Sequence, residues 1–190
     1  MVFLAMENHE EHSDEKAERL IADFKGKFKL MGYTVHHIQE YEQRGKASNV
    51  SWCAERLEEL YFNKERIDPR KVLLTIIDAD SWVPEVYIRE VEDHLSQHLG
   101  DRERYIYQSN QIFTRNQLDV PIVTRTYDQV HGGMHNNNTM SIFGITFPLS
   151  NYSLQFSLAK KIGWWDTCAD AIGEDFHMTE KAFWKTQGNV

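Results

Sequence analysis

Residues 71–81, KVLLTIIDADS, decide the expected fold. The apolar run 72–77 is short and rich in β-branched residues, which is typical of a fully buried strand at the centre of a parallel sheet. It ends in Asp78 and Asp80, two acids separated by one residue. Ligands of open α/β sheets bind at the carboxyl ends of strands, and neighbouring carboxylates there need a positive partner. The pattern predicts a metal and phosphate centre, with a turn carrying two solvated acids as the alternative.

Strand and helix patterns alternate through the first half of the chain. Apolar residues from Ala17 to Met31 recur at helical spacing, and Gly32 is expected to end that helix. Two more helices are expected, one around Trp52 and one after Pro84. The expected strands cover residues 2–6, 33–38, 72–77 and 104–108. This alternation indicates an α/β fold with a largely parallel sheet flanked by helices.

The second half is less regular. We expect a short strand at 122–124, a loop at 131–138, a helix at 153–162 and a terminal helix from 171 through 185. Residues 129–159 contain no Asp, Glu, Lys or Arg. Such a stretch indicates buried core, or else a surface that lies under a membrane or lines an acceptor groove.

Composition limits the possible partners. The chain has 190 residues and a net charge of −8, which argues against nucleic acid bound through bulk charge. The two cysteines form no metal-binding spacing, and no secretory signal or membrane-spanning run is visible. No repeat or linker divides the sequence, so residues 1–190 are expected to form one domain.

A second acidic pair, Glu174 and Asp175, follows Gly173 at the expected start of the terminal helix. Acids are favourable there because the helix dipole is positive at its N-terminus. Helix capping alone would therefore explain the pair. The order of the motifs raises a second interpretation, because this pair follows Asp78 and Asp80 in the chain and could form one site with them.

Four motifs in order resemble family-2 glycosyltransferases of the GT-A fold. They are Gly45-Lys46 with Asn49, Asp78-Ala79-Asp80, Gly163-Trp164-Trp165-Asp166 and Glu174-Asp175. The resemblance covers about residues 33–186 and is closest to the membrane-bound, polysaccharide-synthase-like branch. It implies a Rossmann-like GT-A sheet and an inverting, metal-dependent transfer of a sugar from a nucleoside-diphosphate donor to a saccharide or other hydroxyl acceptor.

The resemblance also implies residue roles. Asp80 would hold Mg²⁺ or Mn²⁺, and Asp78 would share the metal or contact the donor nucleotide. Asp175 would be the catalytic base, with Glu174 orienting it or the acceptor. The remaining roles concern substrate binding: Lys46 on donor phosphates, Asn49 on the donor or its loop, Trp164 and Trp165 as an apolar wall for a sugar face, and Asp166 on sugar hydroxyls. The plain alternatives are a solvated Lys46, a helix-capping Asn49 and core tryptophans.

The chain departs from the family pattern at both ends. It has no P-x-Y/F-N/K-E strand before Val2, and neither a Q/R-x-x-R-W motif nor membrane helices after the acidic pair. We therefore expect a partial catalytic domain, incomplete at the N-terminus and truncated at both ends. Its parent enzyme would lie on the cytoplasmic side of a membrane. Only the missing flanking segments would attach it to that membrane.

Two other functions fit part of the pattern. A haloacid-dehalogenase-like phosphohydrolase would use Asp78 as nucleophile and Asp80 as acid/base. In that family, however, small residues usually follow the motif, whereas Trp82 and Pro84 follow it here. A non-catalytic fragment or binding module that has kept the fold is the third hypothesis.

Overall fold

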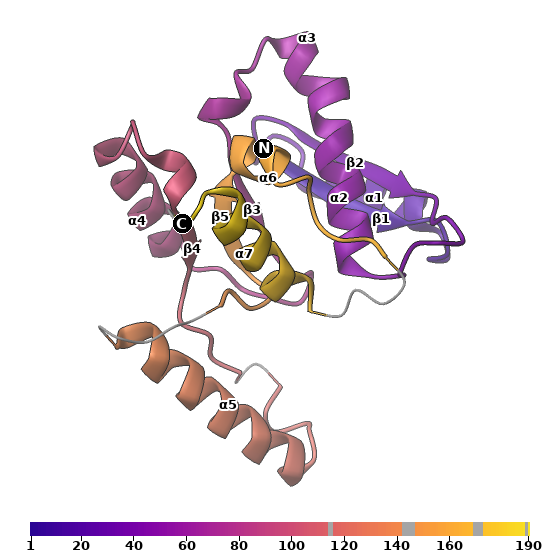
Figure 1. Cartoon of the computed structure of the whole chain (residues 1–190). Coiled ribbons are helices and arrows are strands. Elements are labelled where there is room, and N and C mark those ends of the chain that lie inside the picture. The colour runs from indigo at the N-terminus through magenta and orange to yellow at the C-terminus, as the bar shows by residue number, and fades with distance from the viewer. Residues whose placement is uncertain (114–115, 142–146, 169–172, 189) are drawn as a thin grey trace.

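The computed structural model describes residues 1–113, 116–141, 147–168, 173–188 and 190. Within them, two small sheets are flanked by helices (Figure 1). Strands β1 (Val2–Glu7) and β2 (Met31–His36) pair in parallel, from Val2 opposite Met31 to Glu7 opposite His36. Strands β3 (Leu73–Ile76), β5 (Tyr152–Gln155) and β4 (Ile106–Gln108) form an antiparallel sheet in that order. The chain is thus mixed α/β with one small parallel sheet.

The prediction of a mostly parallel sheet centred on 72–77 is therefore only partly correct. β1 and β2 do pair in parallel, but β3 is an outer strand that runs antiparallel to β5. The central strand, β5, was expected to be helical. All four of its residues are buried, and α6 (Phe156–Lys161) begins directly after it. A buried strand of this length has no diagnostic periodicity, and no turn residue marks its junction with the helix.

The first helix is shorter than its apolar pattern predicts. α1 covers Ser13–Asp23, and Gly26 then turns the chain at φ +79°. Gly32 does not end a helix but lies within β2, where the strand passes close to two aromatic side chains. A Cβ at this position would lie 2.9 Å from Phe3 Cε1 and 2.9 Å from the Tyr61 hydroxyl oxygen. The glycine therefore permits this close packing.

Most other expected elements are present. α2 (Lys46–Leu57) continues through a π-helical turn at Glu58–Phe62 into α3 (Asn63–Glu65), and α4 (Glu85–Gln97) follows Pro84. Short 3₁₀ turns, Pro69–Lys71 and Arg102–Arg104, precede β3 and β4. The terminal helix α7 covers Glu174–Lys185, while residues 171–172 lie outside the described residues.

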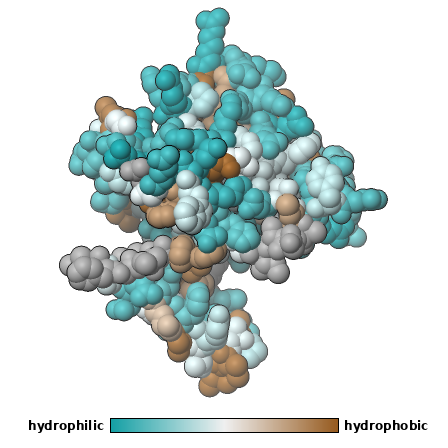
Figure 2. Space-filling view, in the orientation of Figure 1, coloured by the Kyte–Doolittle hydropathy of each residue, from teal (hydrophilic) through white to brown (hydrophobic). Residues whose placement is uncertain are grey.

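α5 (Ile122–Met140) replaces both the strand predicted at 122–124 and the loop predicted at 131–138. Glycine and asparagine disfavour helices, but tertiary contacts hold this one. Asn136 exchanges two hydrogen bonds with the Gln111 backbone, at 3.0 and 2.9 Å, and Phe113 packs over Gly132. The helix projects from the rest of the molecule (Figure 1), and its exposed end carries hydrophobic side chains (Figure 2). The buried-core prediction for 129–159 therefore fails in α5 and is confirmed in β5 and α6.

The core lies where β5, α6 and α7 meet α2. Its largest buried side chains include Tyr152, Leu154, Leu158 and Met178. A second cluster joins Phe156 to Phe62, whose ring centroids are 4.7 Å apart, and it includes Phe3 from β1 and Val72 before β3. The two sheets therefore share a hydrophobic contact. Among the described residues, no helix is long and apolar enough to cross a membrane.

Candidate functional site

The turn after β3 is fixed by a side chain that precedes β5. Asn151 Oδ1 accepts a 2.9 Å hydrogen bond from the Asp78 backbone N–H, and Asn151 Nδ2 donates to Ser81 Oγ at 2.9 Å. The Ser81 N–H in turn donates to the Asp78 carbonyl at 3.0 Å. These bonds hold Asp78 at the end of β3.

Lys46, the first residue of α2, lies among three carboxylates. Its Nζ is 2.9 Å from Asp78 Oδ1, 3.8 Å from Glu174 Oε1 and 4.0 Å from Asp175 Oδ1. The same ammonium donates a hydrogen bond to the Ser150 carbonyl. The structure thus brings three of the predicted motifs together around one cation, although they are far apart in the sequence.

Asp175 occupies the first turn of α7, and Gly173 before it has φ +83°, a left-handed conformation that favours glycine. Asp175 Oδ2 accepts a 2.7 Å hydrogen bond from the Ser150 N–H. Asp175 Oδ1 is buried without a hydrogen-bond partner among the described residues. Burial raises the pKa of Asp175 to about 6. The Ser150 N–H and Lys46 oppose this shift, and Glu174 reinforces it.

Asp80 lies two residues beyond Asp78 and is exposed. The described residues contain no cluster of three His, Cys, Asp or Glu side chains arranged to hold a metal. Two carboxylates nevertheless suit a hard cation, because Mg²⁺ is usually held by one or two carboxylates together with substrate phosphates and water. The pair Asp78 and Asp80 therefore fits a cation that is shared with a phosphorylated ligand.

Asn49 lies one helical turn after Lys46 and contacts a different set of side chains. Its Oδ1 is 3.2 Å from His36 Nδ1, and His36 Nε2 is 3.1 Å from Glu42 Oε2. The His36 ring is also stacked on Trp52, with centroids 5.0 Å apart. Asn49 thus ties the start of α2 to the end of β2, and its role on the donor or its loop stays a prediction.

The Gly163–Asp166 motif packs against α7. Trp165 is only 3% exposed, and its Nε1 donates to the Tyr152 hydroxyl. The prediction of Trp165 as a wall for a sugar therefore needs correction, because its ring is a core side chain. Trp164 is partly buried against Phe156, with ring centroids 5.1 Å apart. Asp166 Oδ1 lies 2.8 Å from Lys181 Nζ on α7.

Sequence reasoning missed Ser150 and Asn151 as parts of this site. Ser150 contacts Lys46 and Asp175, and Asn151 holds the turn that carries Asp78. Their only local signal is that two polar residues precede an apolar segment. Because their partners are distant in sequence, recognising them requires knowing that β5 lies beside β3.

Comparison with known proteins identifies the family. Residues 73–188, from β3 to just beyond α7, match the model of glycosyl transferase family group 2. This range includes Asp78, Asp80, Asp166, Glu174 and Asp175, whereas Lys46 and Asn49 precede it. No curated protein and no solved structure matches the chain. Because the family model covers more than half of the sequence, the chain belongs to glycosyl transferase family group 2 and carries a glycosyltransferase domain.

Proposed function

We propose that this domain moves a sugar from a nucleoside-diphosphate donor to an acceptor hydroxyl with inversion, using Asp175 as the base. The observation that carries the proposal is the contact of Lys46 with Asp78, Glu174 and Asp175, all within 4.0 Å. It joins the end of β3 to the first turn of α7. The family match supports sugar transfer, and the phosphohydrolase alternative loses its support.

The chemistry of Asp175 follows from its two oxygens. Oδ2 is held by the Ser150 N–H, and Oδ1 is free of hydrogen bonds within the described part of the chain. Oδ1 would accept the proton of the acceptor hydroxyl while that oxygen bonds to the anomeric carbon. The bond from this carbon to the donor phosphate breaks, and its electron pair leaves with the nucleoside diphosphate. A pKa of about 6 leaves Asp175 mostly ionised at neutral pH and basic enough to assist.

The donor end would be formed by Asp78 and Asp80. A Mg²⁺ or Mn²⁺ held there would neutralise charge on the leaving diphosphate. Lys46 offsets part of the charge of the three carboxylates, which makes the approach of an anionic donor less unfavourable. Glu174 would orient the acceptor, and Trp164 and Asp166 remain predictions for its sugar-binding side. Attachment to the cytoplasmic face of a membrane also remains a prediction.

Thermal melting with Mn²⁺ plus UDP, and with Mn²⁺ plus GDP, tests the donor site. A ligand at a hundredfold excess over its Kd stabilises the native state by about 2.7 kcal/mol, roughly 5–10 °C for a chain of this size. We expect such a metal-dependent shift with one nucleotide in the wild type and its loss in Asp80→Ala. Asp93→Ala, at an exposed position on α4, is the matched control and should retain the shift. Equal shifts in both variants would contradict the assignment of Asp80.

A further inference from the structure

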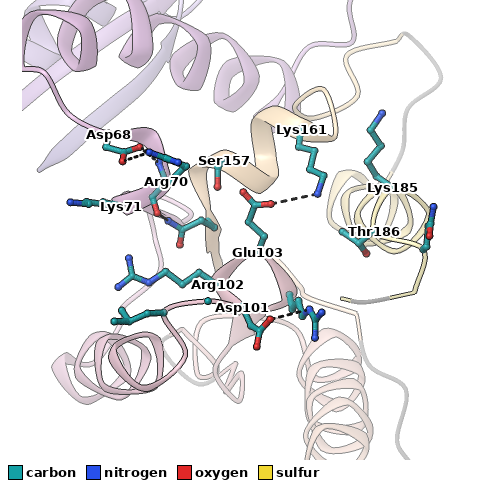
Figure 3. Close-up of a pocket in the computed structure, with 15 residues that line it drawn as sticks. Asp68, Arg70, Lys71, Asp101, Arg102, Glu103, Ser157, Lys161, Lys185 and Thr186 are labelled. Carbon is teal, nitrogen blue, oxygen red and sulfur yellow. Dashed lines mark hydrogen bonds and ion pairs between the residues drawn. The ribbon is translucent and has the colours of Figure 1, made fainter.

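A cavity lies at the opposite end of the β3–β5 pair from Asp78. Its volume is about 740 Å³, and its lining residues come from the segments before β3 and β4, from the end of β5 and from α6 and the end of α7 (Figure 3). Lys71 precedes β3 and Gln155 ends β5, so both lie at this end of the antiparallel pair. Asp78 and Asn151 lie at the other end. The cavity is therefore separate from the candidate donor site.

The cavity is cationic although the chain as a whole carries a charge of −8. Its lining includes only three acids, and each of them has a cationic partner. Asp68 pairs with Arg70 at 3.0 Å, Asp101 with Arg104 at 3.3 Å, and Glu103 with Lys161 at 3.5 Å (Figure 3). Three further cations line the cavity and form no ion pair among the described residues: Lys71, Arg102 and Lys185. The charge of Lys71 is nevertheless felt by Asp68.

Three buried polar atoms in the lining also have no hydrogen-bond partner within the described part of the chain. They are Gln155 Oε1, Ser157 Oγ and Arg102 Nε. Gln155 is only 2% exposed, and its amide is oriented by a 2.6 Å hydrogen bond from Nε2 to the Arg70 carbonyl. Buried polar groups are nearly always satisfied, so atoms left unpaired beside a cavity point to a ligand.

We propose that this cavity binds a phosphate ester that carries a neighbouring hydroxyl group. Arg102 Nε and the ammonium groups of Lys71 and Lys185 donate to anionic oxygens, which suits a phosphate. Gln155 Oε1 accepts only, so it requires a ligand donor, and a hydroxyl supplies one. The chemistry is shared by soluble polyol or sugar phosphates and by the headgroup of a phospholipid.

Isothermal titration with glycerol 3-phosphate, in EDTA to keep metal away from Asp78 and Asp80, tests this site. We expect saturable binding to the wild type that is weakened at least tenfold in Arg102→Gln and in Lys71→Gln. The matched control is Lys27→Gln, an exposed lysine outside the cavity, which removes the same charge and should bind as the wild type does. Asp80→Ala should also retain binding. Lys71 is exposed, so its replacement tests the site even if Arg102→Gln fails to fold.

Sulfate separates this site from a general attraction for anions, because sulfate carries comparable charge but has no proton to donate to Gln155. It should bind at least tenfold more weakly than glycerol 3-phosphate. Equal binding of the two anions, an equal loss in Lys27→Gln, or no saturable binding would overturn the proposal. Sedimentation with phosphatidylglycerol vesicles then identifies the source: loss of vesicle binding in Lys71→Gln indicates a headgroup, and binding of the free ester alone indicates a soluble ligand.

Discussion

Two helices of this chain begin with neighbouring acids, and their surroundings differ. α1 carries Asp14 and Glu15 in its first turn, and both are exposed. α7 carries Glu174 and Asp175 in its first turn, and their side chains are only 23% and 15% exposed. The helix dipole stabilises acids at either position. The local sequence therefore cannot distinguish a helix-capping pair from a site.

What distinguishes α7 is the part of the fold that it meets. Asp175 accepts the Ser150 N–H before β5 and lies beside Lys46 at the start of α2. Burial raises its pKa to about 6, whereas Asp14 and Glu15 in the first turn of α1 are exposed. A buried carboxyl with a raised pKa, next to a cation and a second carboxylate, is a typical arrangement for a catalytic group.

The largest expected difference between the two helices is in activity. Asp175→Asn should lower nucleoside-diphosphate release from a UDP- or GDP-sugar by about 10²–10⁴-fold, because a positioned base contributes that much. Asp14→Asn should change the rate by less than about twofold, since a surface acid takes no part in the reaction. Steady-state assays with the donor that shifts the melting temperature would measure both variants. Similar rates in the two variants would remove Asp175 from the reaction.

The same two variants can be compared for stability. Here the variant that loses activity, Asp175→Asn, should lose no stability. The pKa of Asp175 is higher in the folded chain than in the unfolded chain, so the folded state binds the proton more tightly. Its contribution to stability therefore falls as the pH rises from about 4 to about 6, and ionised Asp175 is unfavourable at pH 7.5. Asp175→Asn should melt at or above the wild-type temperature, a gain of at most about 3 kcal/mol. A strongly lowered melting temperature would show a structural role instead.

Two lysine ion pairs, one in the candidate site and one on the surface, extend the comparison, and a smaller effect is expected for them. Lys46–Asp78 and Lys16–Glu10 both have N–O distances of 2.9 Å, but the lysine side chains are 24% and 51% exposed. Lys46→Met should cost about 1–2 kcal/mol, because it leaves three carboxylates close together, and Lys16→Met should cost less than about 0.5 kcal/mol. Urea unfolding would measure both costs, and equal costs would mean that the site cation adds no stability.

The smallest effect concerns the turn that carries Asp78. Asn151→Ala removes the side chain bonded to the Asp78 N–H and to Ser81. We expect the KM for the donor to rise about five- to tenfold, equivalent to about 1 kcal/mol, with little change in kcat. Asn8→Ala, at an exposed asparagine beside α1, is the control. An unchanged KM in Asn151→Ala would mean that the turn does not position the donor.

The sequence predicted residues whose motifs are local. Lys46, Asp78, Glu174 and Asp175 were identified from short patterns in order, and the structure brings them together. Ser150 and Asn151 were not identified, because their roles depend on the pairing of β3 with β5. Trp165 was assigned to a sugar, but its ring is a core side chain whose partner is the Tyr152 hydroxyl. Asn49 contacts His36, and its role on the donor or its loop stays a prediction.

The fold shows the same division between local and long-range information. Strand β1 and helices α2, α4 and α7 follow from periodicity and from boundary residues such as Pro84 and Gly173. The antiparallel β5 and the helix α5 do not. The first is too short and too buried for its period to show, and the second is held by long-range contacts from Gln111 and Phe113 that offset its glycines.

The pH dependence of donor turnover tests the central claim most directly, because it measures the base itself. With wild-type protein that remains folded from pH 4.5 to 8.5, the rate should rise about tenfold per pH unit up to about 6 and then level off. Lys46 lowers the pKa of Asp175, so the inflection should move to higher pH in Lys46→Met. A flat profile, or an inflection near 4 in both proteins, would contradict the assignment of Asp175 as the base.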